Sequence, residues 1–114
     1  MAENITIRKA EGKWVVRAGG AVLGETTAAL ELDETGHAPV IYFPRGDIAM
    51  AFLDPSETRS TCPGKGEARY YSIETKSTTL KDAAWSYEAP TRTAERIRDH
   101  LAFRADDTVT VERI

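Results

Sequence analysis

Short extended stretches separated by turn residues are the feature that most restricts how this chain can fold. Ile5–Lys9 alternates between apolar and polar residues, which is typical of a strand with one buried face. Turn residues such as Gly19–Gly20 and Pro44 separate such stretches, and strands and helices do not alternate regularly. We count seven or eight short strands and two short helices. This pattern predicts a mainly β fold with a minor α part, built as a single domain (residues 1–114) from two antiparallel sheets.

One predicted strand and the two predicted helices stand out from the alternating pattern. Pro39–Phe43 is apolar on both faces, as expected of a central strand that is covered on both sides. Asp47 is suited to cap a short helix over Ile48–Leu53, which Asp54–Ser56 would end. A second helix is predicted after Pro90, because Ala94, Ile97 and Leu101 are spaced for burial on one face.

The bulk composition excludes several classes of protein. The net charge of -3 argues against a non-specific nucleic-acid binder, which normally carries a basic excess. No apolar run approaches the roughly 20 residues that cross a bilayer. A single cysteine allows no intramolecular disulfide, and the N-terminus lacks the pattern of a signal peptide. We therefore expect a cytoplasmic protein that binds neither nucleic acid nor membrane.

Aromatic residues in the middle of the chain form the first candidate site. They are Tyr42, Tyr70, Trp85 and Tyr87. Alternation places Trp85 and Tyr87 on one face of a strand beside the small Ala83, and such an aromatic wall leaves room for a flat or cationic ligand. The alternative is that these aromatic residues belong to the core.

Four charged residues flank the apolar strands and form the second candidate site. Arg45 and Lys65 are suited to clamp an anion such as a phosphate or a carboxylate. Asp47 or Asp82 would then act as a base or hold a metal ion. The alternative is that the four residues pair with one another, because an unpaired buried charge costs several kcal/mol.

Cys62 is the third candidate, as a reactive thiol. Lys65 lies three residues away, and a nearby ammonium group favours the nucleophilic thiolate form. The alternative is a small apolar residue in a turn. The chain has no Asp-x-Asp pair in a strand-like context, no phosphate-binding loop between a strand and a helix, and two isolated histidines, so we expect no bound metal and no cofactor.

A family resemblance rests on four spaced motifs. They are Tyr42–Asp47, Leu53–Ser56, Cys62–Gly66 with Ala68 and Tyr70, and Asp82–Tyr87. With these motifs nearly the whole chain resembles domain-of-unknown-function family 427, which some collections label nucleotidyltransferase-like. Members of that family are typically small, stand-alone bacterial cytosolic proteins.

The resemblance implies a β-tent, in which two antiparallel sheets join near one edge and splay apart at the other. That fold is similar to the thalidomide-binding domain of cereblon and to methionine sulfoxide reductase B. Those relatives hold a zinc ion with paired Cys-x-x-Cys motifs, and the single Cys62 does not carry that site over. Their ligand pocket is an aromatic cage, and similarity assigns Trp85 to such a cage.

Three functions follow as hypotheses. The leading one is a domain that binds a small molecule against Trp85 and the tyrosines, with Arg45 and Lys65 as polar anchors. The second is an enzyme, which either handles nucleotides with the four charged residues and a metal ion or performs thiol chemistry at Cys62. The third is a protein-interaction module that works through exposed sheet edges, through which the chain would also form homo-oligomers.

Overall fold

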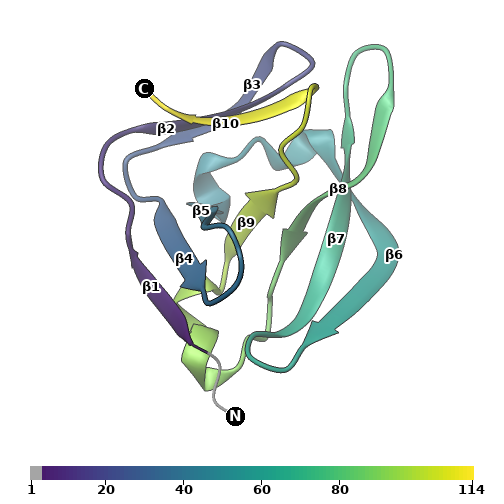
Figure 1. The fold of residues 1–114 in the computed structure, drawn as a ribbon. Helices are drawn as coiled ribbons and strands as arrows, with labels where there is room; N and C mark the ends of the chain where they lie inside the picture. Colours follow the sequence, from purple (N-terminus) through teal and green to yellow (C-terminus); the bar gives the residue numbers. More distant parts are fainter. Residues whose placement is uncertain (1–3) are drawn as a thin grey trace.

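The computed structural model describes residues 4–114, and strands make up most of them (Figure 1). The strands are β1 (Ile5–Lys9), β2 (Trp14–Ala18), β3 (Ala21–Thr26), β4 (Leu30–Glu34), β5 (Val40–Pro44), β6 (Leu53–Cys62), β7 (Gly66–Glu74), β8 (Thr79–Ser86), β9 (His100–Phe103) and β10 (Val109–Arg113). The helical segments are the 3₁₀ turns η1 (Arg45–Asp47), η2 (Met50–Phe52) and η3 (Arg92–Ile97). The prediction of a mainly β fold is confirmed.

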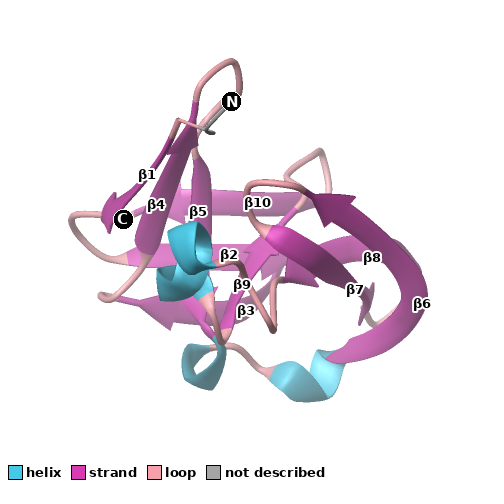
Figure 2. Cartoon of the chain, turned by 90° about the horizontal axis from the view of Figure 1, so that it is seen from below, coloured by secondary structure: helices cyan, strands magenta, loops and turns pink. Residues whose placement is uncertain are grey.

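The strands form two antiparallel sheets, as predicted. The larger sheet has the order β1-β4-β5-β9-β8-β7-β6, and the smaller has the order β10-β2-β3. The short β9 joins β5 to β8, so the larger sheet consists of two wings: β1, β4 and β5 on one side of β9, and β6, β7 and β8 on the other. Figure 1 shows the smaller sheet lying across one end of these wings and η3 at the other end. Figure 2 shows β6 curving round the outer edge of its wing.

Two apolar clusters lie on opposite faces of the larger sheet. Phe43 belongs to the cluster that the smaller sheet covers through residues such as Val16. Tyr42, its neighbour in β5, belongs to a second cluster that contains Ala94 and Ile97 of η3. Because successive strand residues point to opposite faces, β5 is buried on both sides, with Tyr42 1% and Phe43 0% exposed. The prediction of a central, doubly covered strand here is confirmed.

The predicted helix over Ile48–Leu53 is wrong, and Asp47 caps no helix. Asp47 is the last residue of η1, while Ile48 is extended and pairs with Gly24 of β3. The amide of Ala49 donates a hydrogen bond to the backbone oxygen of Leu23 at 2.8 Å. A segment of six residues cannot meet the cost of helix nucleation by itself, so contacts with β3 decide its conformation.

The second predicted helix is also wrong, because it is a 3₁₀ turn followed by a strand. The helical path of η3 ends at Arg98, whose ψ is 140°, and Asp99 then takes a left-handed φ of 62°. Leu101 then lies in β9, a strand that the sequence pattern did not reveal. The spacing of Ala94, Ile97 and Leu101 suits a helix, but pairing with β5 and β8 buries Leu101 in a sheet instead. Across residues 4–114, no helix has the length and apolar character that crossing a bilayer requires.

Pro55 lies within a strand and not after a helix as predicted. It belongs to β6, which is the edge strand of its wing. Proline has no N–H group for a second neighbour, and an edge strand needs none on its open side. The register between β6 and β7 shifts between Pro55 and Arg59, so the strand is irregular at this point.

Candidate functional site

A hollow of about 320 Å³ lies between the two wings, and we call it the inner hollow. Its lining residues are Val40, Tyr42, Lys65, Tyr70, Asp82, Trp85, Tyr87 and Arg104. The structure therefore brings together all four aromatic residues that the sequence singled out. Tyr42 comes from β5 on one wing, and Tyr70 of β7, Trp85 of β8 and Tyr87 directly after β8 come from the other. Lys65 and Asp82 of the charged set join them.

Trp85 connects the two wings across the inner hollow. It is the direct cross-strand partner of Tyr70, and the two ring centroids lie 6.4 Å apart with an angle of 42° between the planes. Its indole Nε1 donates a hydrogen bond to the hydroxyl oxygen of Tyr42 at 3.3 Å. Trp85 and Tyr70 are half-buried, whereas Tyr42 and Tyr87 are buried. The half-buried rings therefore form the wall that a ligand would contact.

Burial keeps the hydroxyl groups of Tyr42 and Tyr87 neutral. Desolvation raises the pKa of Tyr42 to about 12, although the hydrogen bond from Trp85 acts in the opposite direction. Burial also raises the pKa of Tyr87. A phenol with a raised pKa is protonated at neutral pH and is a poor general base. These hydroxyls are therefore suited to hydrogen bonding and not to proton abstraction.

The raised pKa of Tyr42 predicts a loss of stability at alkaline pH. In the unfolded chain a tyrosine has a pKa of ~10, so the stabilisation from keeping Tyr42 neutral is fully present below that pH and is lost as the pH rises through about 12. The free energy of unfolding then falls by up to ~1.4 kcal/mol per pH unit. Urea unfolding between pH 8 and 11 should show a shallower decline for Tyr42→Phe than for the wild type. Equal slopes would contradict the assignment.

Lys65 already has a partner within the protein. It lies in the tight turn between β6 and β7, where its amide donates to the backbone oxygen of Cys62 at 3.0 Å. Its Nζ lies 2.9 Å from Glu34 Oε1 at the end of β4, and their side chains are only 14% and 18% exposed. Nζ also lies 5.7 Å from the centroid of the Tyr87 ring. This ion pair connects the two wings.

Glu34→Gln is expected to lower the free energy of unfolding by about 1–2 kcal/mol, because Lys65 keeps its charge in a poorly hydrated place. The matched control is Glu95→Gln. Glu95 Oε2 lies 3.0 Å from Arg98 Nε, but those side chains are 51% and 56% exposed, and the expected loss is below ~0.5 kcal/mol. Chemical denaturation of both variants measures the difference, and losses of equal size would show that the Lys65 pair is no stronger than a surface pair.

Asp82 is the ionised acid of the inner hollow. The hydroxyl side chains of Ser56 and Thr58 hold the pKa of its carboxyl group below the usual value, and Thr58 Oγ1 donates a hydrogen bond to its Oδ2 at 2.7 Å. Its other oxygen, Oδ1, is buried and has no hydrogen-bond partner within residues 4–114. Its backbone is held with φ at 53°, and Arg104 donates to its backbone oxygen at 3.1 Å. Asp82 is therefore a fixed carboxylate with one free oxygen.

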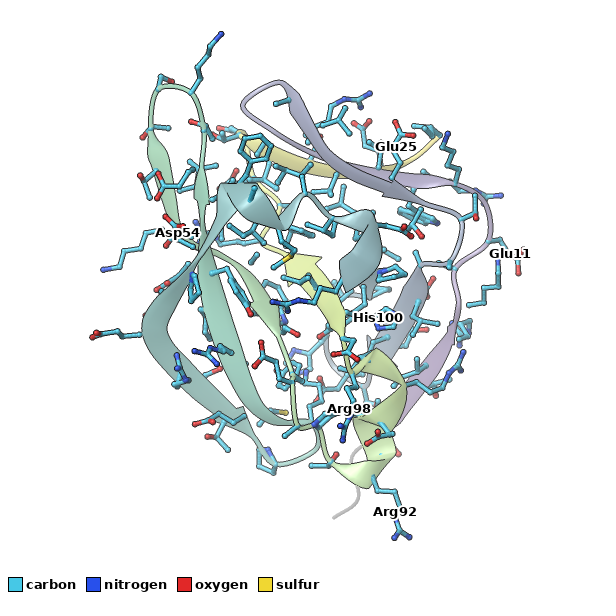
Figure 3. All side chains as sticks on the ribbon, turned by 180° about the vertical axis from the view of Figure 1, so that it is seen from behind. Glu11, Glu25, Asp54, Arg92, Arg98 and His100 are labelled. Atoms are coloured by element: carbon cyan, nitrogen blue, oxygen red, sulfur yellow. The ribbon has the colours of Figure 1, made fainter. Side chains whose placement is uncertain are left out.

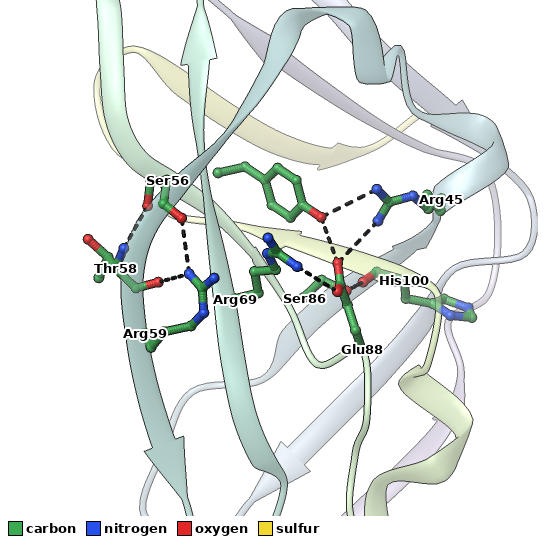
Figure 4. A network of polar contacts seen from close by, with 9 residues as sticks. Arg45, Ser56, Thr58, Arg59, Arg69, Ser86, Glu88 and His100 are labelled. Carbon is green, nitrogen blue, oxygen red and sulfur yellow. Dashed lines mark hydrogen bonds and ion pairs between the residues drawn. The ribbon is translucent and has the colours of Figure 1, made fainter.

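Arg45 lies in a different cluster, so it forms no clamp with Lys65. Its Nη2 donates to the hydroxyl of Tyr71 at 3.3 Å, and its Nη1 lies 3.7 Å from Glu88 Oε2 (Figure 4). Tyr71 is the neighbour of Tyr70 in β7 and points to the opposite face. Within residues 4–114, the four charged residues singled out from the sequence form no ion pair with one another: Arg45 pairs with Glu88, and Lys65 pairs with Glu34.

The remaining candidates, Asp47 and Cys62, lie outside the lining of the inner hollow. Asp47 is exposed in η1, whereas Cys62 is half-buried at the end of β6, against the second apolar cluster. Within residues 4–114, no group of three or more His, Cys, Asp or Glu side chains is placed to hold a metal ion. One of the two histidines, His100, has its ring Nδ1 2.8 Å from the backbone oxygen of Arg98 instead.

Three residues of this region were missed by sequence reasoning. Glu34 was not among the candidates, but it ends β4 and holds Lys65. Arg104 was not among them either, but it follows β9 and lines the inner hollow. Val40 was identified only as part of a strand. An apolar stretch at 101–103 directly before Arg104 was the available signal for a strand there.

A larger groove of about 620 Å³ lies between the β2–β3 and β7–β8 hairpins. Its lining residues are Gly19, Gly20, Ala21, Leu23, Phe52, Glu74, Thr75 and Lys76. Its apolar side has only one aromatic ring, that of Phe52, and its polar residues follow one another at the β7–β8 turn instead of converging from several strands. Ligand sites combine an apolar wall with a few converging polar groups, and the inner hollow fits that description better.

The comparison with protein families agrees with the resemblance carried by the motifs between Tyr42 and Tyr87. No curated protein matches the chain. Residues 6–113, which include most of β1 and all later strands, match a family described as a domain of unknown function (DUF427). The chain therefore belongs to the family of domains of unknown function DUF427.

Proposed function

We propose that the inner hollow binds a small, flat ligand that carries a hydrogen-bond donor or a positive charge. The observation that carries this proposal is the convergence of four aromatic side chains and one ionised carboxylate, from both wings, on one hollow of about 320 Å³. The rings of Tyr70 and Trp85 would form the wall against which the flat ligand lies. The volume is at the small end of the range for ligand pockets, which favours a ligand of one or two rings.

The charges of the inner hollow favour a donor or a cation over an anion. Lys65 is neutralised by Glu34 at 2.9 Å. The guanidinium of Arg104, the other cation in the lining, already donates to the backbone oxygens of Lys81 and Asp82 at 3.3 and 3.1 Å. Asp82, in contrast, has one oxygen without a protein partner. The faces of aromatic rings attract cations, and a buried acceptor gains most from a donor that satisfies it.

Thermal unfolding with a ligand panel tests this proposal. The panel contains methylated ammonium compounds, pyrimidine nucleosides, cyclic imides, amino-acid derivatives, and nucleotides with and without Mg²⁺. A ligand at 100 times its Kd adds ~2.7 kcal/mol. At ~4 °C per kcal/mol, that moves the midpoint by roughly 10 °C. We expect the shift in the wild type, a smaller shift in Asp82→Asn, and none in Trp85→Ala.

Phe52→Ala is the matched control, because it removes an aromatic ring outside the inner hollow that is 51% exposed. It should keep the full ligand shift. If Trp85→Ala still folds and responds like the wild type, the ligand binds elsewhere. If Asp82→Asn shows the same shift as the wild type, the ligand needs no hydrogen-bond donor or positive charge, and that part of the proposal is wrong.

The enzyme and interaction hypotheses remain predictions, and the same panel tests the first of them. A nucleotide shift that requires Mg²⁺ would favour nucleotide chemistry. Thiol chemistry at Cys62 requires fast alkylation at neutral pH, and slow alkylation would exclude it. An interaction through the open edge of β6 would appear as a concentration-dependent oligomer in sedimentation.

A further inference from the structure

Three arginines gather on the face of β7 opposite the inner hollow. Arg45, Arg59 and Arg69, together with Tyr71 and Glu88, form what we call the arginine cluster (Figure 4). Glu88 is its centre: it accepts a hydrogen bond from the Tyr71 hydroxyl at 2.7 Å and lies 3.5 Å from Arg69 Nη1 and 3.7 Å from Arg45 Nη1. The guanidinium carbon of Arg45 also lies 5.6 Å from the centroid of the Tyr71 ring.

The arginine cluster carries more positive charge than its carboxylate can balance. Three guanidinium groups and one carboxylate leave a net charge of +2, in a chain whose total is -3. Arg59 and Arg69 are direct cross-strand partners, and like charges in that position destabilise a sheet. The Arg59 guanidinium donates to the backbone oxygens of Ser56 and Thr58, both at 3.0 Å, and pairs with no carboxylate among the residues that the structure describes.

The guanidinium N–H donors of the arginine cluster also lack strong hydrogen-bond acceptors. The distances of 3.5 and 3.7 Å to Glu88 exceed the ~2.7–2.9 Å of a strong charge-assisted hydrogen bond. Nε of Arg69 is buried without a hydrogen-bond partner within residues 4–114. The side chains of Arg45 and Arg69 are 39% and 43% exposed, so both forks remain accessible from solvent.

We propose that the arginine cluster binds a doubly charged oxyanion of the phosphate-monoester class. The planar guanidinium forks of Arg45 and Arg69 match the geometry of phosphate oxygens, and a charge of -2 balances the excess of +2. Glu88 competes for the same donors, so binding requires its carboxylate to move aside. The site lies on the other face of β7 from the inner hollow and does not depend on the function proposed there.

Nuclear magnetic resonance of the arginine Nε–Hε groups tests this site directly. Inorganic phosphate and phenyl phosphate are titrated against sodium chloride of equal ionic strength. We expect the Arg45 and Arg69 signals to shift with both phosphates and not with chloride. Tighter binding of phenyl phosphate would identify an ester as the ligand, whereas equal binding would identify free phosphate.

Three variants give the decisive comparison. Arg69→Gln should weaken phosphate binding at least about tenfold, because it removes charge-assisted hydrogen bonds. Glu88→Gln should strengthen binding, because it removes the competing carboxylate but keeps an acceptor for Tyr71. Arg92→Gln is the matched control: Arg92 points away from the molecule at η3, and its loss should change nothing (Figure 3).

Two results would overturn the proposal. One is a phosphate response no larger than that of chloride, and the other is weaker binding in Glu88→Gln. If Arg69→Gln fails to fold, Glu88→Gln and Arg45→Gln decide the question in its place, since both of those residues are only partly buried.

Discussion

Phe43→Ala is expected to lower the free energy of unfolding by about 3–5 kcal/mol. Phe43 is 0% exposed in β5 and packs edge-to-face on Phe103, with ring centroids 5.8 Å apart. It is also the cross-strand partner of Leu101 in β9, the strand that joins the two wings. Removing its ring leaves a cavity that rigid strands on both sides cannot close. The midpoint of thermal unfolding should fall by roughly 12–20 °C, at ~4 °C per kcal/mol.

Phe52→Ala is the control for this loss, because it deletes the same ring where the side chain is 51% exposed. Its effect should stay within about 0.5 kcal/mol. Calorimetry and urea unfolding of both variants measure the difference. A loss below ~1 kcal/mol for Phe43→Ala would mean that β5 is not buried on both faces.

Gly24→Ala is expected to cost about 3 kcal/mol, at the upper end for overpacking. A Cβ atom on Gly24 would overlap the backbone oxygen of Asp47 and would lie 2.7 Å from Ile48 Cδ1. Gly24 pairs with Ile48 in a bridge that connects the smaller sheet to the segment after η1. A backbone oxygen cannot rotate away as a side chain does, so β3 must move away from this segment.

Gly46→Ala is the matched control for this substitution. A Cβ atom at Gly46 would meet nothing within 4 Å, so the change should be neutral or stabilise by up to ~1 kcal/mol through the unfolded state. Chemical denaturation of the two alanine variants should therefore give shifts in opposite directions or differ by about 3 kcal/mol. Equal shifts would show that the close approach of β3 to Asp47 is not maintained in solution.

The first of these predictions concerns a strand that also lines the inner hollow. Phe43 lies behind Tyr42, so the same short strand anchors the core on one face and lines the hollow on the other. The Lys65–Glu34 ion pair then connects the wings on the side of the hollow. We therefore expect ligand binding to be sensitive to changes in this scaffold, as well as to changes at Trp85.

Much of the strand pattern could be predicted from local sequence. Apolar residues on both faces of 40–43 identified the central strand, and alternation identified β1 and β8. The glycine at 66, in the turn after Cys62, has a φ of 109°, which other residues rarely adopt. These features depend on neighbours in the chain, which is why they could be read from the sequence.

The two predicted helices and the unpredicted strand β9 show where prediction from local sequence fails. The apolar spacing at 94, 97 and 101 fits a helix, but β9 forms because β5 and β8 each offer it a partner. Ile48 is extended because Gly24 lets the backbone of β3 approach closely. In both places a contact between distant parts of the chain outweighs a weak local preference.

The sequence by itself determined the class of fold, most strands, the family, and the residue types of the candidate site. Tertiary structure alone decided which of those residues meet. In the folded chain Tyr42 contacts Trp85, 43 positions away, and Lys65 pairs with Glu34, 31 positions away. Arg45 pairs with Glu88 and does not lie beside Lys65. The physical reason is that alternation and turn chemistry act between neighbours in the chain. Pairing across the wings depends instead on the order of strands in the sheet, which no local pattern encodes.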